Sequence, residues 1–498
     1  MIMFYPKVYS YYPALVKITC RANCLSLVLI LVFSSFVYAQ SEAIIQTTSV
    51  RHAQPEPPIN RSNGGTSDRS VLRANRSLQL PFFDDFSEQG QKLSSQQLWE
   101  ETDKVMVNNQ YPILPPTVGV ATLDRHNEVG RLYDNSYGIY GDVLTSQGVD
   151  LTSNSSGTLY LSFYVQPRGL QYHICPCPSD ALRLEFLACP DNGTCEWETV
   201  SMIKVSEDVT SGELGEFLIP YIPILFLDNA TFTFFSKEIV EPRFLHPNFQ
   251  FRLTSEYAAS NTGGRWHIDY VEIKSHNTSP QSPAALDLGF VSPPDNRFYP
   301  YTTMPWEEFH GNEFSYWNPT QPVVVRNLGE QTQNILFPDL EVRALDGSLL
   351  HYEAFANVNN QPVSPLGLNI YNQSIEYGSI ALNQNPKAII TSFSMEEESP
   401  TGVVTNNSIE HTTTFQDKLS YDDGTTELIL DIFSIKKEIA VKYSVYEPTT
   451  IHGVEFVVAE YENNPADNYK VRIYLDDLNS VPVIINGSSY RPHPNDTV

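Results

Sequence analysis

Short runs of alternating apolar and polar residues recur between residues 80 and 275 of the chain. A period of two places every second side chain on the same face of a β-strand, so each run predicts a strand with one buried face. The predicted buried faces in residues 158–165, 181–187 and 249–253 consist of Leu159, Leu161, Phe163, Val165, Leu182, Leu184, Phe186, Phe249, Phe251 and Leu253. A series of such strands broken by turn residues predicts two sheets packed face to face.

The run that closes this module, residues 266–273, changes phase. Trp266 and Tyr270 share one face, whereas Asp269 falls on the face of Val271 and Ile273. Either a β-bulge re-aims the strand at this point, or Asp269 is buried and needs hydrogen-bond donors or a cation.

Two further β modules are expected after a Pro- and Ser-rich linker at residues 279–297. Alternating runs and Gly-Asn-Asp turns over residues 285–399 predict an immunoglobulin-like sandwich. A third module spans residues 415–498 and contains an alternating run at residues 469–475. It is too short to close a sandwich of its own, so we expect an incomplete β module and a truncated chain.

The first 79 residues carry no comparable pattern. Residues 1–39 combine basic residues, an apolar run and a small-residue site at Val37-Tyr38-Ala39, which predicts a cleaved signal peptide; the alternative is an uncleaved anchor. Residues 40–79 are rich in Ser, Asn, Arg and Pro and predict a disordered tether or propeptide. We therefore expect a secreted or cell-surface protein without a transmembrane segment after removal of the leader.

Composition supports an all-β, multidomain chain. The 498 residues exceed what one core can bury, and 35 Pro with 12% aromatic residues favour turn-rich β structure. The net charge is −27, and it becomes −30 once the three basic residues of the acid-free leader are removed. Such a charge excludes nucleic acid as a partner and fits an extracellular surface, a neutral glycan or an extracellular protein.

Several phrases of the sequence resemble those of large secreted proteins of Bacteroidetes that are exported by the type IX secretion system. The phrases occur in the expected order and are Leu80-Pro81-Phe82-Phe83-Asp84-Asp85-Phe86, Leu98-Trp99-Glu100, residues 115–124, Trp266-His267-Ile268-Asp269-Tyr270-Val271, Met304-Pro305-Trp306 and residues 421–427. The first module is also similar to MAM and concanavalin-like jelly rolls, and the resemblance implies a jelly-roll sandwich at residues 80–275. The sorting domain that normally ends such proteins is not seen before Val498. The resemblance to these secreted proteins implies no particular activity for this chain.

Four cysteines lie close together in the first module: Cys175, Cys177, Cys189 and Cys195. An even, clustered set in a chain with a leader predicts two disulfides. Cys175 and Cys177 are too close in sequence to bond each other, so we expect each to pair with Cys189 or Cys195. The alternative is a zinc site that includes His173, although its spacing lacks the usual Cys-x-x-Cys pairs.

Asp84, Asp85 and Asp269 are candidate calcium ligands, because hard cations bind several carboxylate and carbonyl oxygens and jelly rolls of the resembled kind often carry structural calcium. The alternative is that they are turn, capping or surface carboxylates. Asp422 and Asp423 precede Gly424 and fit a hairpin turn better than a ligand pair.

No catalytic residue is predicted. The sequence contains no His-Glu-x-x-His, Gly-x-Ser-x-Gly or phosphate-binding glycine loop, and we interpret His267 as structural. Three functions stay open at this point. The first is a non-catalytic adhesion or glycan-binding protein. The second is a hydrolase, or the accessory part of one whose catalytic residues lie beyond residue 498, and the third is a structural surface or motility-associated protein.

Overall fold

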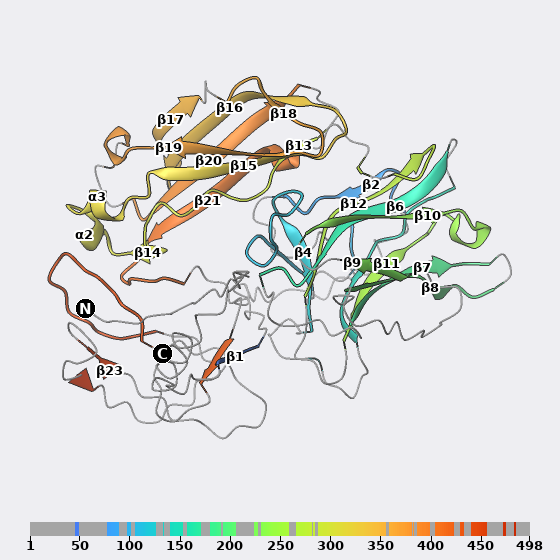
Figure 1. Cartoon of the computed structure of the whole chain (residues 1–498), viewed down its shortest axis with the longest axis horizontal. Coiled ribbons are helices and arrows are strands. Elements are labelled where there is room, and N and C mark those ends of the chain that lie inside the picture. Colours follow the sequence, from blue (N-terminus) through green and yellow to red (C-terminus); the bar gives the residue numbers. More distant parts are fainter. Residues whose placement is uncertain are drawn as a thin grey trace, which may run out of the picture. The chain divides into compact units, whose positions relative to one another are not determined.

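The computed structural model describes 22 segments of the chain in two compact units, one formed by residues 48–428 and the other by residues 1–47 and 429–498. The described segments are residues 45–48, 77–88, 97–100, 105–125, 133, 140–152, 157–170, 180–190, 193–205, 224–227, 231–257, 265–280, 282–283, 287–354, 358–380, 382, 386–398, 404–422, 429–432, 440–455, 472–474 and 483–484. Their regular secondary structure is nearly all β-strand, arranged in several antiparallel sheets that form β-sandwiches, as predicted (Figure 1).

The first sandwich consists of two sheets. One has the order β10-β6-β12-β4-β3, and β2 also pairs with β12; the other has the order β5-β11-β7-β8-β9. Its strands are β2 (Phe82–Asp84), β3 (Met106–Asn108), β4 (Val120–Leu123), β5 (Tyr140–Thr145), β6 (Thr158–Pro167), β7 (Ala181–Ala188), β8 (Glu196–Val205), β9 (Ile224–Leu227), β10 (Thr233–Ile239), β11 (Phe251–Glu256) and β12 (Trp266–His276). The short 3₁₀ helix η2 (Pro242–Phe244) precedes β11.

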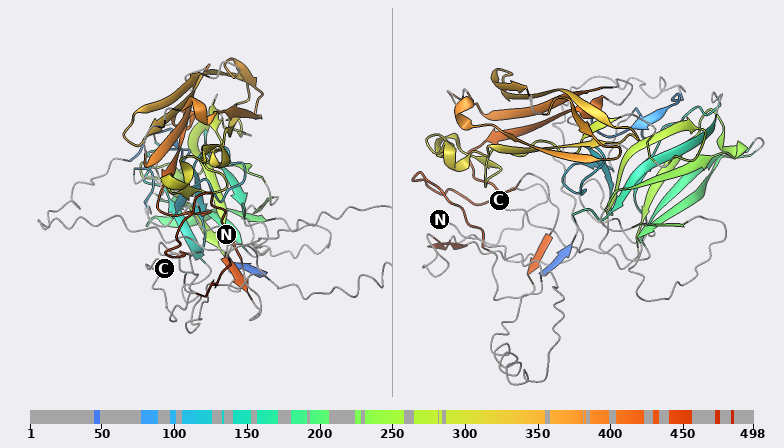
Figure 2. Two further views of the ribbon diagram at one scale, coloured as in Figure 1. Left: turned by 90° about the vertical axis from the view of Figure 1, so that its left-hand side faces the viewer. Right: turned by 45° about the horizontal axis from the view of Figure 1, so that its top comes forward.

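The core of the first sandwich lies between these two sheets (Figure 2). All ten apolar side chains that the alternating runs placed inward belong to it. Burial of large aliphatic and aromatic side chains on both inner faces stabilises the sandwich by roughly 1.5–3 kcal/mol for each fully buried side chain. Trp99 adds aromatic contacts with Phe82, Phe86 and Phe251, at ring-centroid distances of 5.4–5.9 Å.

A β-bulge explains the phase change at residue 269. The register of β12 on β6 shifts between Asp269 and Glu272, and Tyr270 has a φ of +54°. Before the bulge Trp266 points into the core; after it Val271 does so, whereas Tyr270 contacts Phe83 on another side. Both alternatives apply, because the bulge is present and Asp269 is also fully buried and accepts hydrogen bonds from the Thr117 and Tyr270 amides. The expectation that Tyr270 shares a face with Trp266 is wrong, because the bulge lies between them.

The second sandwich packs a three-stranded sheet, β13-β15-β19, on a larger sheet with the order β14-β21-β20-β16-β17, in which β18 pairs with β16. The strands are β13 (Leu288–Phe290), β14 (Thr303–Met304), β15 (Thr320–Asn327), β16 (Gln333–Ala344), β17 (Leu349–Ala354), β18 (Gln361–Val363), β19 (Leu368–Ser374), β20 (Ala388–Glu397) and β21 (Ser408–Phe415). Short helices are α2 (Trp306–Phe309), α3 (Glu313–Tyr316), η3 (Tyr377–Ser379) and η4 (Thr405–Asn407).

Two boundaries differ from the expectation. β21 pairs with β20 over its whole length, so the second sandwich continues past residue 399 to residue 415. β13 lies inside the predicted linker at residues 279–297, where Leu288 and Phe290 are buried despite the Pro- and Ser-rich composition. In both places a strand with two buried apolar side chains, Leu288 and Phe290 in β13 and Ile409 and Phe415 in β21, completes a sheet, and local composition does not indicate this packing.

The other unit contributes β22 (Ile429–Ile432), β23 (Arg472–Ile473) and β24 (Val483–Ile484). β1 (Ile45–Thr48) pairs with β22 and lies within residues 40–79, for which no regular structure was expected. The predicted signal peptide and most of the predicted third module lie outside the described residues. Among the described residues, no helix has the length and apolar character needed to cross a membrane.

Candidate functional site

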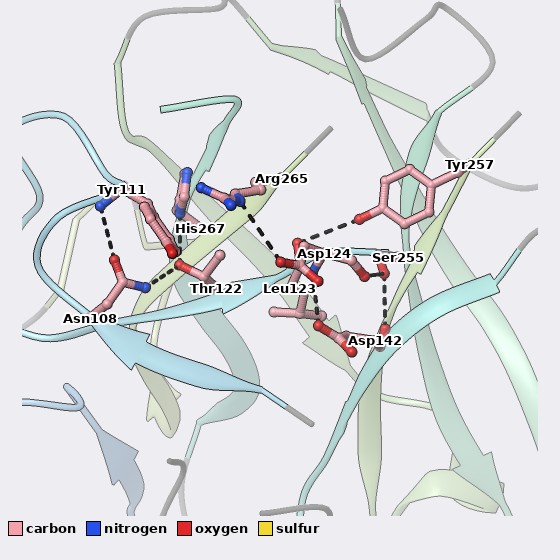
Figure 3. A network of polar contacts seen from close by, with 10 residues as sticks. All are labelled: Asn108, Tyr111, Thr122, Leu123, Asp124, Asp142, Ser255, Tyr257, Arg265 and His267. Carbon is pink, nitrogen blue, oxygen red and sulfur yellow. Dashed lines mark hydrogen bonds and ion pairs between the residues drawn. The ribbon is translucent and has the colours of Figure 1, made fainter. Parts of the chain in front are cut away.

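A buried polar network joins the two sheets at one end of the first sandwich (Figure 3). Its side chains come from the ends of β3, β4 and β11 and from the starts of β5 and β12. We call it the end network; its members are Asn108, Tyr111, Thr122, Asp124, Asp142, Ser255, Tyr257, Arg265 and His267, all at most 8% exposed.

Hydrogen bonds connect the network across the sheets. The Asp124 amide donates to Asp142 Oδ2 at 2.8 Å, and the Ser255 hydroxyl donates to the Asp142 carbonyl at 3.0 Å. Arg265 Nε lies 3.8 Å from Asp124 Oδ2, and the Arg265 guanidinium lies 3.7 Å from the centroid of the Tyr111 ring. Pairing and ring stacking compensate the desolvated charges of Arg265 and Asp124.

Two titratable groups of the end network, His267 and Tyr257, are held in their neutral forms. Burial lowers the pKa of His267 to about 3, with a further contribution from the charge of Arg265, and its Nδ1 lies 2.9 Å from Thr122 Oγ1. Burial also raises the pKa of Tyr257 well above its usual value of 10. Neither group exchanges a proton near neutral pH, which fits a structural role at this end of the sandwich and disfavours acid–base catalysis by His267 or Tyr257. This agrees with the interpretation of His267 as structural.

A second polar group lies on the outer face of the sheet formed by β5, β11, β7, β8 and β9. Leu182, Leu184 and Phe186 of β7 point into the core, so the side chains between them point outward. We call this group the face ladder; it consists of Glu256, Arg183, Glu185, Arg252 and Trp197.

The face ladder is held in place by cross-strand contacts. Arg252 donates from Nε and Nη2 to both oxygens of Glu185, at 2.6 and 3.1 Å, and its guanidinium lies 4.3 Å from the centroid of the Trp197 ring. Arg183 pairs with Glu256. The side chains of Arg183 and Arg252 are 24% and 30% exposed, whereas that of Glu185 is 6% exposed. The ladder thus presents ordered guanidinium groups and an indole at a partly exposed, electrically balanced surface.

The three predicted calcium ligands have protein donors. Asp84 accepts from the Phe86 amide at 2.9 Å and from Trp99 Nε1 at 2.7 Å, and burial raises its pKa to about 6. Asp85 accepts from the amide and the hydroxyl of Ser87. Burial is also the main cause that raises the pKa of Asp85.

Asp269 accepts from the amides of Thr117 and Tyr270, at 2.9 and 2.7 Å. Thr117 brings Asp269 and the backbone of Asp85 together, since its hydroxyl contacts both, but Asp84 points toward Trp99. In the described part of the chain, no three or more His, Cys, Asp or Glu side chains are arranged to hold a metal ion. Calcium at Asp84, Asp85 and Asp269 stays a prediction that their contacts do not favour.

The disulfide pairing differs from the expectation. Cys189 is bonded to Cys195, across the turn between β7 and β8. The predicted pairing of each with Cys175 or Cys177 is therefore wrong, because the hairpin brings Cys189 and Cys195 together with Cα atoms 4.2 Å apart. Cys175, Cys177 and His173 lie outside the described residues. Asp422 is described, and its carbonyl accepts from the Thr302 hydroxyl, as suits a turn residue.

One carboxylate pair could not be predicted from sequence. Asp287 and Glu397 lie within hydrogen-bonding reach of each other, and burial is the main cause that raises the pKa of both. They are 0% and 9% exposed, and much closer together than the roughly 5–9.5 Å that separates glycosidase carboxyl groups. The pair is thus unsuited to glycoside hydrolysis. Trp197 was also missed, because only strand register places it beside Arg252.

Comparison with known proteins gives no family. No family model matches the chain, and no curated protein matches it. Among solved structures, it is similar to the Endo-D glycoside hydrolase domain from Streptococcus pneumoniae, with 10% identity, a TM-score of 0.23 and coverage of 68% of this chain and 44% of that one.

Two further structures show a similarity of the same low order. A β-1,2-glucanase from Parabacteroides distasonis has 10% identity, a TM-score of 0.23 and coverage of 69% of this chain and 40% of that one. The tandem CBM22-1–CBM22-2 domain of a Paenibacillus barcinonensis protein has 9% identity, a TM-score of 0.19 and coverage of 70% and 97%. The chain spans less than half the length of the two hydrolases. Similarities at this TM-score carry no conclusion about ligand or activity.

Proposed function

We propose that the chain is an exported, non-catalytic protein that binds a neutral glycan on the face ladder of the first sandwich. The observation that carries the proposal is the row of ordered guanidinium and carboxylate groups beside Trp197. Arginine and glutamate side chains fixed by bidentate contacts offer hydrogen bonds to hydroxyl groups at little further cost in side-chain entropy. An indole beside them offers an apolar surface to the face of a sugar ring.

Charge supports a neutral ligand. The chain as a whole has a net charge of −27, yet the face ladder contains two arginines and two glutamates. A balanced patch on an acidic protein neither attracts polyanions nor requires a cationic partner. Export, and export by the type IX route, rest on the predicted leader and on the resemblance of the quoted phrases.

A hydrolase is the alternative. Among the described residues, the acidic and histidine side chains with the largest pKa shifts are buried. A catalytic acid or base lies in a cleft that a substrate can enter, so their burial disfavours this alternative. The third hypothesis is a purely structural surface protein, and it requires no ligand on the face ladder.

A glycan array probed with the full chain tests the proposal. Trp197→Ala removes the indole, and we expect binding to weaken by about tenfold or more, which corresponds to a loss of about 1.4 kcal/mol or more. Arg252→Lys keeps the charge but removes the bidentate contact and the planar stacking, so it should weaken binding as well.

The matched control is Phe314→Ala, because Phe314 is 88% exposed and lies on α3 of the second sandwich. It should leave glycan binding unchanged. Equal losses in Phe314→Ala and Trp197→Ala would contradict the face-ladder site. A wild-type chain that binds no glycan would favour the structural alternative, and turnover abolished by one Asp or Glu substitution would favour the hydrolase.

A further inference from the structure

Four buried oxygen atoms that have no donor among the described residues belong to neighbouring residues of the second sandwich. They are Asp287 Oδ1, Glu397 Oε2, Asn406 Oδ1 and Asn407 Oδ1. Asp287 precedes β13, Glu397 ends β20, and the two asparagines belong to η4. All four side chains are at most 9% exposed, and Asp287 and Asn406 are fully buried.

Hydrogen bonds place these four residues side by side. Asn406 Nδ2 donates to Asp287 Oδ2 at 3.1 Å, and Asn407 Nδ2 donates to Glu397 Oε1 at 2.9 Å. Asp287 and Glu397 lie within hydrogen-bonding reach of each other. Protein donors thus hold Asp287 Oδ2 and Glu397 Oε1 in place. Asp287 Oδ1 and Glu397 Oε2 are left for a further partner.

Within the described part of the chain, no protein cation compensates the two carboxylates. Among the described residues, the groups that act most strongly on the pKa of either acid include no arginine or lysine, and no ion pair involves either acid. Asp85 acts on Asp287 with the same sign of charge. A buried carboxylate without a positive partner is costly by several kcal/mol, so the site requires either a proton or a cation.

A cation accounts for more of the observations than a proton does. A proton shared by Asp287 and Glu397 would give those two carboxyl oxygens a partner and leave the amide oxygens of Asn406 and Asn407 without one. Calcium binds six to eight oxygen atoms in flexible geometry and accepts both carboxylate and amide oxygens. Its charge of two would also balance the two carboxylates.

We propose that Asp287 and Glu397, together with the side-chain oxygens of Asn406 and Asn407, bind a divalent cation of the calcium type. The site differs from the one predicted at Asp84, Asp85 and Asp269, where both oxygens of every carboxylate accept a hydrogen bond from the protein. Its function is structural: the ion ties the start of β13, the end of β20 and η4 together. Tyr270 of the first sandwich donates to Asp287 Oδ2 at 2.8 Å, so the ion also supports that contact.

Calcium binding to the full chain, stripped of metal with a chelator, tests this proposal. The double variant Asp287→Asn with Glu397→Gln keeps the size of both side chains and removes both charges. We expect it to bind one calcium ion fewer per chain than the wild type at pH 7.5, by equilibrium dialysis. Its melting temperature should no longer rise with calcium, because a ligand bound only to the native state stabilises by mass action.

Asp84→Asn is the matched control, since it removes a buried carboxylate whose two oxygens each have a protein donor. It should retain the wild-type number of bound calcium ions. If the double variant does not fold, terbium provides a second measurement on the wild type. Tyr270 should sensitise terbium luminescence, calcium should quench it by displacement, and Tyr270→Phe should lose it.

Two results would overturn the proposal. One is equal calcium binding by the wild type and the folded double variant. The other is a wild type that shows no calcium response and becomes more stable as the pH falls, which would identify a shared proton as the partner of Asp287 and Glu397.

Discussion

Burial, more than any neighbouring charge, determines the protonation state of His267. The imidazole is fully buried beside Thr122, and its Cα lies on β12 where β12 pairs with β4. Gly169 is required next to it, because a Cβ at residue 169 would lie 2.4 Å from His267 Nε2. At the residue scale, the structural role of His267 was predicted from the sequence. Its hydrogen-bond partner was not, because Thr122 is 145 residues away in the chain.

The low pKa of His267 predicts that the first sandwich loses stability in acid. The unfolded chain binds a proton near the ordinary pKa of 6.5, whereas the folded chain does so only near pH 3. The contribution of His267 to the free energy of unfolding is therefore fully present above pH 6.5 and is lost as the pH falls toward 3. The loss amounts to about 2 kcal/mol at pH 5. His267→Asn should lack this loss. Urea unfolding at pH 7 and pH 5 checks it, and an equal pH dependence in both proteins would contradict it.

Alternation along the chain predicts which elements form, and tertiary contacts decide how they end. The inward faces of β6, β7 and β11 follow from periodicity alone, because one residue of slip would expose every core side chain. The bulge in β12 was visible as a change of phase at Asp269. The pairing of Cys189 with Cys195 and the position of β21 were not predictable, because both depend on strand register.

The turn that leads into β4 requires glycine at residue 119. Gly119 has a φ of +87°, and a Cβ there would lie 2.1 Å from the Phe86 carbonyl oxygen. Gly119→Ala should destabilise the first sandwich by about 3 kcal/mol, since backbone strain of about 1–2 kcal/mol adds to overpacking of about 1–3 kcal/mol. Thermal and urea unfolding measure the loss.

Gly347 is the matched control for Gly119. Its φ is +85°, but no atom lies within 4 Å of a Cβ at that position. Gly347→Ala should therefore carry only the backbone strain, about 1–2 kcal/mol. Losses of the same size in both variants would show that the close approach to Phe86 has no energetic effect.

At the scale of the unit formed by residues 48–428, the two sandwiches are joined by specific contacts. The Val118 amide donates to the Phe290 carbonyl at 2.7 Å, and Arg326 Nη2 donates to the Leu114 carbonyl at 3.1 Å. Sequence predicted two modules and a linker at residues 279–297, and it gave no sign that Asp287 within that linker is fully buried. Composition describes a segment by its average. The burial of Asp287 depends instead on a few side chains, such as Tyr270 of the first sandwich, that reach it only after both modules fold.

Tyr270 and Asp287 provide a test of whether the two sandwiches unfold together. Tyr270→Phe removes the hydrogen bond to the Asp287 carboxylate, a type of bond that contributes about 1.5–3 kcal/mol, and leaves the aromatic ring in place. Hydrogen exchange in the presence of chelator should then show reduced protection in β6 of the first sandwich and in β20 of the second. Tyr352→Phe is the control, because its hydroxyl bonds Asp339 within the second sandwich on an exposed surface. It should leave β6 unchanged. Loss of protection in only one sandwich after Tyr270→Phe would mean that the two sandwiches unfold independently despite their contacts.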